Sequence, residues 1–222
     1  MDRKIFVTAD GSYSVMDNDT NLTFHSRHGA LQESMHIFIR AGLLPLLNNN
    51  STMIRVFEMG FGTGLNALLT LAESDKYSVK VSYHAIDLFL LPESITSGLN
   101  YCQSPEMAKW ESSFQMMHSA KIGEKISLSP NFIFLKSNMD ISLFDTEDKF
   151  DLVYYDAFGP DDQPEVWTAS IFQKVQSWLV TGAILVTYSA KGQVRRSLEQ
   201  SGFRTKKLPG PPGKREFIVA EK

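Results

Sequence analysis

Residues 54–66 read Ile54-Arg55-Val56-Phe57-Glu58-Met59-Gly60-Phe61-Gly62-Thr63-Gly64-Leu65-Asn66. In this segment a short apolar run ends in an acid, and three glycines follow on alternate positions before a helical pattern begins. A buried strand that turns tightly into a helix needs backbone without Cβ atoms, both for the turn and for a ligand that approaches the main chain. The segment therefore predicts a strand, a ligand-binding turn and a helix, with a glycine-rich turn that binds nothing as the alternative.

The spacing of these glycines differs from two common nucleotide-binding motifs. The dinucleotide motif G-x-G-x-x-G would need glycine where Leu65 stands, and the phosphate-binding motif G-x-x-x-x-G-K-[ST] does not occur. The pattern acid-x-Gly-x-Gly-x-Gly resembles the first motif of the class I methyltransferases that use S-adenosylmethionine (SAM). This resemblance implies that the three glycines lie beneath a cofactor that carries no phosphate.

The composition is that of one soluble α/β domain with at most a small appendage: 222 residues, 43% hydrophobic and 21% charged. No apolar run approaches the roughly 18–20 residues that a membrane span needs, and the N-terminus lacks the apolar core of a signal peptide. The single cysteine, Cys102, permits neither an internal disulfide nor a multi-cysteine zinc site, so a cytoplasmic protein is expected. The five histidines lack the spacing of metal ligands, and we expect no metal.

Charge is unevenly distributed along the chain. The net charge is −3, but the segment from Ser189 to Lys222 has nine basic residues and three acids, which leaves a charge of −9 on the remainder. A basic end on an acidic body can steer a polyanion to one face of a protein. A solvated helix face followed by an exposed tail is the alternative interpretation.

The apolar periodicity predicts strands that alternate with helices. Strands are expected over residues 54–57, 79–86, 132–135, 150–155, 183–187, 205–208 and 217–220, and helices over 65–73, 165–179 and 193–200. Before them we expect a hairpin over 4–16 and a helix over 30–47 that Gly42 ends or interrupts. Residues 88–131 read as irregular and partly helical. The prediction is a doubly wound α/β fold with a mainly parallel, seven-stranded sheet, divided into an extension over 1–50 and a compact domain over 51–222.

Polar side chains stand at the ends of four predicted strands. Ligands of such sheets bind outside the carboxyl ends of the strands, where the strand order reverses. Glu58 ends the first strand, and Asp87 ends the second, 23 residues after Gly64, near the ~20 expected for a carboxylate that binds ribose hydroxyls. Asn138 follows the third strand and Asp156 the fourth. Each acid alone suits a helix cap or a loop, but polar hydrogen-bonding groups at four strand ends together predict a SAM site.

The segment after the fourth strand suggests what the site methylates. Asp156, Phe158 and Pro160 place an acid, an aromatic ring and a proline at the expected mouth of the cleft. An aromatic ring can stack on a nucleobase taken out of its helix, and an acid can orient an amine toward a methyl donor. Phe158 could instead be a core aromatic, and for Trp167 we expect the role of a helix-face anchor.

Several ordered motifs resemble the methyltransferase half of the bifunctional tRNA 5-methylaminomethyl-2-thiouridine biosynthesis proteins. The matching segments are Phe24–Ser34, Gly60–Asn66, Asp156–Pro160, Pro164–Thr168, Val194–Arg196 with Gly202–Phe203, and Gly213–Glu216. The resemblance covers nearly the whole chain. It implies a tRNA substrate and transfer of a methyl group from SAM to the amine of a 5-aminomethyl group on the wobble uridine, or 2-thiouridine, giving 5-methylaminomethyl.

The resemblance also implies residue roles, carried over by position. For the cofactor these are Glu58, Gly60, Phe61, Gly62, Gly64, Asn66, Asp87, Asn138 and Asp156. Asp156 would orient the amine, and Phe158 would hold the base or close the cleft. Further substrate contacts would come from His28, Glu33, Tyr155 and Pro160, and contacts to tRNA phosphates from Arg195, Arg196, Lys206, Lys207, Lys214 and Arg215.

The chain departs from that family at several points. No counterpart of its flavin-dependent oxidoreductase half is found, so we expect SAM and neither FAD nor a metal as cofactor, and a monomer as the plausible state. Ala157 and Gly159 replace the usual Gly and Ala, and Asn138 stands where an acid is more usual. Three alternatives stay open: methylation of another amine on a small molecule or protein, a catalytically silent RNA-binding relative, and, with the wrong glycine spacing, a nicotinamide dehydrogenase.

Overall fold

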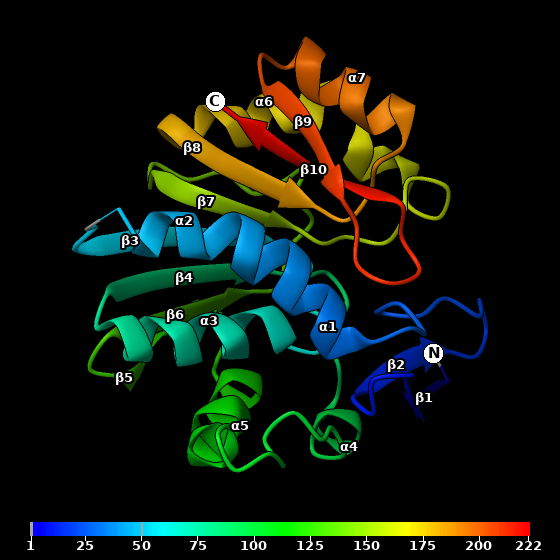
Figure 1. Cartoon of the computed structure of the whole chain (residues 1–222), viewed down its shortest axis with the longest axis vertical. Coiled ribbons are helices and arrows are strands. Elements are labelled where there is room, and N and C mark those ends of the chain that lie inside the picture. The colour runs from blue at the N-terminus through cyan, green and yellow to red at the C-terminus, as the bar shows by residue number, and fades with distance from the viewer. Residues whose placement is uncertain (1, 50) are drawn as a thin grey trace.

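The computed structural model describes residues 2–49 and 51–222, and an eight-stranded sheet forms the centre of that part of the chain (Figure 1). The strand order is β5-β6-β4-β3-β7-β8-β10-β9. The strands are β3 (Met53–Met59), β4 (Lys80–Ile86), β5 (Lys125–Ser129), β6 (Phe132–Ser137), β7 (Phe150–Tyr155), β8 (Leu179–Thr187), β9 (Arg204–Pro209) and β10 (Glu216–Glu221).

The strand directions confirm the doubly wound α/β fold. Strands β6, β4, β3, β7 and β8 pair in parallel, whereas β10 is antiparallel to both β8 and β9. The chain moves outward from β3 in one direction through β4 and β6, and then in the other through β7 and β8. The order therefore reverses at β3, and a ligand site is expected between the carboxyl ends of β3 and β7.

The sheet has one strand more than the seven predicted. Strand β5 lies in the segment 88–131, which was predicted to be irregular, and it pairs antiparallel with β6 through a turn at residues 130–131. Its sequence, Lys125-Ile126-Ser127-Leu128-Ser129, has two apolar residues in an edge position and a register shift at the bulge between Ser127 and Ser129. This apolar pattern is too weak to predict a strand by itself, and the segment is a strand because it pairs with β6. The same segment also contains α4 (Glu93–Thr96), η2 (Ala108–Trp110) and α5 (Glu111–Ser119).

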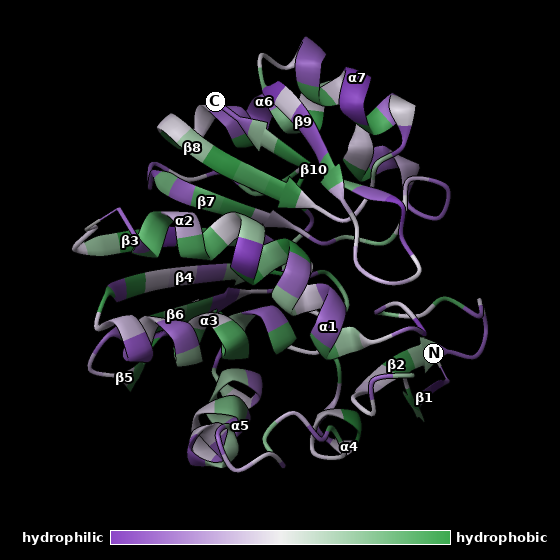
Figure 2. Cartoon of the chain, viewed as in Figure 1, coloured by the Kyte–Doolittle hydropathy of each residue, from purple (hydrophilic) through white to green (hydrophobic). Residues whose placement is uncertain are grey.

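Helices cover both faces of the sheet (Figure 1). One face is covered by α3 (Leu65–Tyr77) and by the helical run α1 (Ala30–Ser34), η1 (Met35–Leu43) and α2 (Leu44–Leu47), and the other by α6 (Ala169–Ser177) and α7 (Gly192–Gln200). Figure 2 shows apolar residues concentrated on β7 and β8 and polar residues on the outer side of α7. Within the described residues, no helix combines the length and apolar character needed to cross a membrane.

Two helix predictions differ from the structure. Gly42 does not end its helix: η1 is a nine-residue π-helix that continues directly into α2. A Cβ atom at Gly42 would lie 3.2–3.3 Å from side-chain atoms of Val186, Leu152 and Tyr154, so this glycine serves close packing of the helix on the sheet. The helix predicted over 165–179 is broken into η3 (Pro164–Trp167) and α6, because Thr168 is extended and its hydroxyl accepts a hydrogen bond from the Ile171 amide.

The N-terminal hairpin is present as predicted, with β1 (Arg3–Val7) antiparallel to β2 (Tyr13–Asp17). It forms a separate two-stranded sheet at the end of the molecule toward which β7 and β8 point (Figure 1). The helix that follows belongs to the core, because Ile37, Phe38 and Ile39 are at most 1% exposed. The boundary predicted after residue 50 falls at Asn50, outside the described residues, and stays a prediction.

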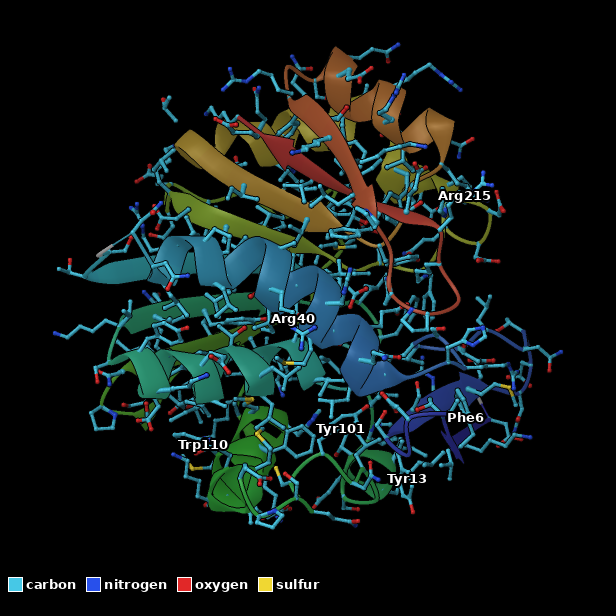
Figure 3. All side chains as sticks on the ribbon, viewed as in Figure 1. Phe6, Tyr13, Arg40, Tyr101, Trp110 and Arg215 are labelled. Atoms are coloured by element: carbon cyan, nitrogen blue, oxygen red, sulfur yellow. The ribbon has the colours of Figure 1, made fainter. Side chains whose placement is uncertain are left out.

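Substitution of Gly42 tests the close packing of η1 on the sheet. We expect Gly42→Val to lower the free energy of unfolding by about 2 kcal/mol, since the new atoms overfill a space bounded by two strands. Arg40→Val is the matched control, because Arg40 is exposed on the same helix (Figure 3) and should cost less than about 0.7 kcal/mol. Urea unfolding measures the free energy of unfolding of both variants. Equal decreases in Gly42→Val and Arg40→Val would contradict this role of Gly42.

Candidate functional site

A cavity of about 400 Å³ opens at the carboxyl ends of the central strands. Its floor comes from the turn after β3 and the segment after β7, and its walls from residues 21–26, the end of β4 and the loop between β9 and β10. The lining residues are Asn21, Leu22, Thr23, Phe24, His25, Ser26, Glu33, Met59, Gly60, Gly62, Asp87, Leu88, Phe89, Asp156, Ala157, Phe158, Gly159, Asp162, Gln163, Tyr188, Gly213 and Lys214. The predicted switch point therefore coincides with the cavity.

The glycine turn brings the ends of β3 and β7 together. Gly60 has a φ of +91°, and a Cβ atom there would lie 2.5 Å from the carbonyl oxygen of Asp156. The Asp156 amide donates to the carbonyl of Met59 at 2.9 Å. Gly62, with a φ of +50°, lies against the Phe24 ring. The turn thus needs glycine for its backbone conformation and for its neighbours.

Asp87 is fixed at the end of β4 by two backbone amides. Its Oδ2 accepts a hydrogen bond from Gly62 at 2.8 Å, and its Oδ1 accepts one from Phe89 at 2.8 Å. Burial raises the pKa of Asp87, and these two hydrogen bonds oppose that shift. Asn138 is exposed outside the cavity lining, where its Nδ2 donates to the carbonyls of Asp87 and Leu88 at 2.8 and 2.9 Å. Asn138 therefore holds the loop that carries Asp87.

Asn66 joins two carboxylates at the centre of the site. Its Nδ2 donates to Oε1 of Glu58 at 3.1 Å and to Oδ2 of Asp156 at 2.9 Å. Glu58 is fully buried beneath the cavity, and burial followed by the charge of Asp156 raises its pKa well above the usual value. Burial, followed by repulsion from Glu33, also raises the pKa of Asp156 well above its usual value. Burial therefore opposes ionisation of both carboxyl groups, whereas the hydrogen bonds from Asn66 favour it.

Aromatic rings form one wall of the cavity. Phe158 meets Phe24 edge to face, with ring centroids 5.2 Å apart. The carbonyl of Phe158 accepts a hydrogen bond from Nε1 of Trp167 at 2.7 Å, and Trp167 is buried, as expected for a helix anchor. Tyr188 donates its hydroxyl hydrogen to the Ala157 carbonyl at 2.8 Å. The backbone around Phe158 is thus held by two buried or half-buried rings.

Several predicted site residues lie away from the cavity. Phe61 is buried against Phe134 and His118, and Gly64 begins α3 behind the turn. Tyr155 is a core residue whose hydroxyl donates to Val166, and Pro160 is buried outside the lining. These residues support the site from behind.

The predicted basic residues divide into two groups. Lys214 lines the cavity, whereas the remainder are exposed on α7, β9 and the end of the following loop: Arg195, Arg196, Lys206, Lys207 and Arg215. Arg195 is paired with Glu199 at 3.5 Å and Lys207 with Glu216 at 2.7 Å. His28 is exposed beside Gly213, just outside the lining.

Sequence reasoning missed many of the residues that line the cavity. Among them are Phe24, His25, Asp162, Gln163 and Tyr188. Phe24 and His25 begin the segment that carried the resemblance, and Tyr188 follows β8 directly. The rule that ligands bind at strand ends, applied to a fifth strand, would have found Tyr188.

The strand order and the glycine-lined cavity at the switch point define a class I methyltransferase fold. Residues 102–222, more than half of the chain, match the family model described as S-adenosyl-L-methionine-dependent methyltransferase, and the chain belongs to that family. A protein of Leptospira interrogans (serovar copenhageni), named tRNA 5-methylaminomethyl-2-thiouridine biosynthesis bifunctional protein MnmC, is 31% identical over 209 residues. That match covers 88% of this chain and 32% of the relative.

Two further similarities agree with this assignment. The protein of the same name from Burkholderia thailandensis is 27% identical over 212 residues, covering 89% of this chain and 32% of that protein. The chain thus spans about a third of the length of these curated relatives. The crystal structure of MNMC2 from Aquifex aeolicus has a TM-score of 0.82 and 24% identity, and the match covers 99% of this chain and 70% of that chain, which confirms the fold.

The cavity fits the chemistry of the cofactor that the family implies. Gly60 and Gly62 line the cavity without side chains, so a ligand can approach their main chain. Asp87 offers a fixed carboxylate for ribose hydroxyls, and Asp156, held by Asn66, offers a second carboxyl group in the cavity lining for a cationic group. The described residues contain no cluster of three His, Cys, Asp or Glu side chains that could hold a metal ion.

Substitution of Gly60 tests whether this turn holds the methyl donor. We expect Gly60→Ala to weaken SAM binding more than about tenfold, because the new methyl group would displace the Asp156 carbonyl. Gly123→Ala is the matched control: its φ is +78°, but a Cβ atom there meets nothing within 4 Å. Calorimetry with SAM measures the affinity of each variant. If Gly60→Ala binds SAM as tightly as the wild type, the SAM site does not lie at this turn.

Proposed function

We propose that this methyltransferase transfers the methyl group of SAM to the primary amine of a 5-aminomethyl group on the wobble uridine of tRNA. The observation that carries the proposal is the placement of Asp156 beside the Phe24–Phe158 wall, in the cavity formed by the glycine turn. The carboxyl group of Asp156 suits an amine as the methyl acceptor, and the aromatic wall suits a flat base. The names of the curated relatives, of which the chain spans about a third, support tRNA as the substrate class.

The acceptor amine must arrive at the reaction uncharged. An aliphatic amine has an ordinary pKa of roughly 10.4, as in lysine, and its ammonium form has no lone pair for attack. When bound, SAM supplies a methyl group on a positively charged sulfur. Partial burial in the cavity disfavours the ammonium form, and the Asp156 carboxylate accepts a hydrogen bond from the amine and directs its lone pair.

The carboxylate of Asp156 is held for this task by Asn66. The Nδ2 hydrogen bond at 2.9 Å fixes the plane of the carboxyl group and favours its ionised form. Burial and Glu33 act in the opposite direction and raise the pKa of Asp156. Because methyl transfer needs the ionised form as acceptor, the activity falls as the pH drops through this raised pKa.

The aromatic wall suits a base that has left its stack. The rings of Phe24 and Phe158 meet at an interplanar angle of 78°, so the edge of one ring contacts the face of the other. A flipped uracil can stack on such a surface while its 5-substituent reaches Asp156. Helix α7 and strand β9 lie in the same upper part of the molecule as Arg215 (Figure 3), and their exposed basic residues would contact tRNA phosphates.

Analysis of modified nucleosides tests the proposed function. Incubation of the protein and SAM with tRNA that carries 5-aminomethyl-2-thiouridine should convert it to the 5-methylaminomethyl nucleoside, detected by mass spectrometry as a gain of one methylene unit. The matched control is the same tRNA with an unsubstituted wobble uridine, which lacks the amine. Methyl transfer into small amines or protein, with none into tRNA, would support a different acceptor.

Replacement of Asp156 tests its role toward the acceptor. We expect Asp156→Asn to lower kcat at least about 100-fold, because the acceptor oxygen that orients the amine becomes part of a neutral amide. The affinity for SAM should stay within about threefold of wild type. Asp161→Asn on the same loop is the control, since Asp161 is exposed and outside the cavity lining. Loss of SAM binding in Asp156→Asn would instead assign Asp156 to the cofactor.

A further inference from the structure

Lys214 is the one residue of the predicted tRNA-binding set on the C-terminal segment that lines the cavity. It lies in the loop 210–215, which joins β9 to β10 and contains two prolines and two glycines. The loop is closed by hydrogen bonds from the Gly210 amide to the Arg215 carbonyl at 3.0 Å and from the Lys214 amide to the Pro211 carbonyl at 2.9 Å. Its backbone therefore presents Lys214 to the cavity in a defined position.

Two partners hold the ammonium group of Lys214. Its Nζ lies 3.3 Å from Oε2 of Glu33, whose side chain is only 7% exposed, and 4.3 Å from the centre of the Tyr188 ring. Tyr188 is itself fixed by the hydrogen bond from its hydroxyl to the Ala157 carbonyl. An exposed lysine is a hydrated point charge on a flexible stem. Lys214 is instead restrained inside the site.

Titratable groups from several elements surround Lys214. Glu33 comes from α1, Asp156 follows β7, Tyr188 follows β8, and His25 follows β2; Asp162 lines the same cavity. Burial, together with Lys214, lowers the pKa of His25 to about 4, so this imidazole is neutral at pH 7. Burial and nearby carboxylates raise the pKa of Tyr188, so its hydroxyl is neutral too. Lys214 is then the fixed cation among these groups.

Lys214 and Glu33 act on Asp156 in opposite directions. The negative charge of Glu33 raises the pKa of Asp156, whereas the positive charge of Lys214 lowers it. A fixed cation also disfavours the charged form of any amine bound beside it, as like charges repel. One ammonium group can therefore favour both protonation states that methyl transfer needs: an ionised carboxyl and a neutral amine.

We propose that Lys214 is a positioning residue of the acceptor site, where its restrained cation keeps the bound amine neutral and Asp156 ionised, and that it does not contact tRNA phosphate. This inference rests on the proposed function. The entering ammonium loses one proton to water. The neutral amine then forms the new N–C bond with its lone pair, the electron pair of the broken S–C bond stays on sulfur, and the product is a secondary ammonium. Lys214 itself neither gains nor loses a proton.

The pH dependence of kcat tests the proposal, with tRNA carrying 5-aminomethyluridine and saturating SAM. Because kcat rises as the bound amine is deprotonated, Lys214→Met should move this rising limb up by about one pH unit, slow the reaction about tenfold at pH 7 and approach the wild-type rate at high pH. Lys214→Arg, which keeps the charge, should leave the limb within about 0.3 pH units of wild type. Lys80→Met, at the far end of β4, controls for the loss of one charge.

Binding of the same tRNA without a methyl donor separates the alternatives. Under the proposal, Lys214→Met keeps the wild-type slope of log Kd against log salt, whereas Lys206→Met, an exposed lysine on β9, lowers it by about one. A lowered slope in Lys214→Met, or an equal loss of kcat at every pH, overturns the proposal in favour of a phosphate contact or a structural role. A wild-type protein that methylates no tRNA amine at any pH shows that the proposed function has failed, and the inference with it.

Discussion

The site depends on one amide group that holds two buried acids together. Glu58 and Asp156 come from the ends of the adjacent parallel strands β3 and β7, and both would repel each other if ionised. The Nδ2 of Asn66, from the first turn of α3, donates to both carboxyl groups and so partly satisfies them. Buried carboxyls need such partners, because desolvation without hydrogen bonds costs several kcal/mol. The bridge fixes the side chain of Asp156, whose backbone is held beside the Gly60 turn by its amide hydrogen bond to Met59.

The cavity is completed by segments from the two ends of the chain. Residues 21–26 and Glu33 form one side, and Lys214 forms the other. The two sides are joined by the ion pair between Glu33 and Lys214, and by the hydrogen bond between Nε2 of His36 and the carbonyl of Pro209 at 2.8 Å. The sheet therefore provides the floor of the site, whereas its walls need contacts between segments about 180 residues apart in the chain.

Much of the fold could be predicted because its strands carry strong local signals. The buried parallel strands β3 and β7 are largely apolar, and an acid stands near the end of each, Glu58 in β3 and Asp156 just after β7, at the edge where ligands bind. The prediction was weakest where the sequence has no such run. Strand β5 exists through its pairing with β6, and Gly42 lies inside a helix because a sheet packs against it. Neither cause can be read from the residues themselves.

The sequence alone determined the doubly wound fold, the glycine turn and the polar side chains at four strand ends, since periodicity and residue type record them locally. Only the tertiary structure decided which polar groups share the cavity. In it Phe24 contacts Phe158, Asn138 lies outside the cavity and holds a loop, and Lys214 of the basic segment pairs with Glu33. Such contacts depend on how segments that are distant in the sequence pack together. The periodicity of apolar residues within one segment does not report that packing, so these contacts could not be predicted.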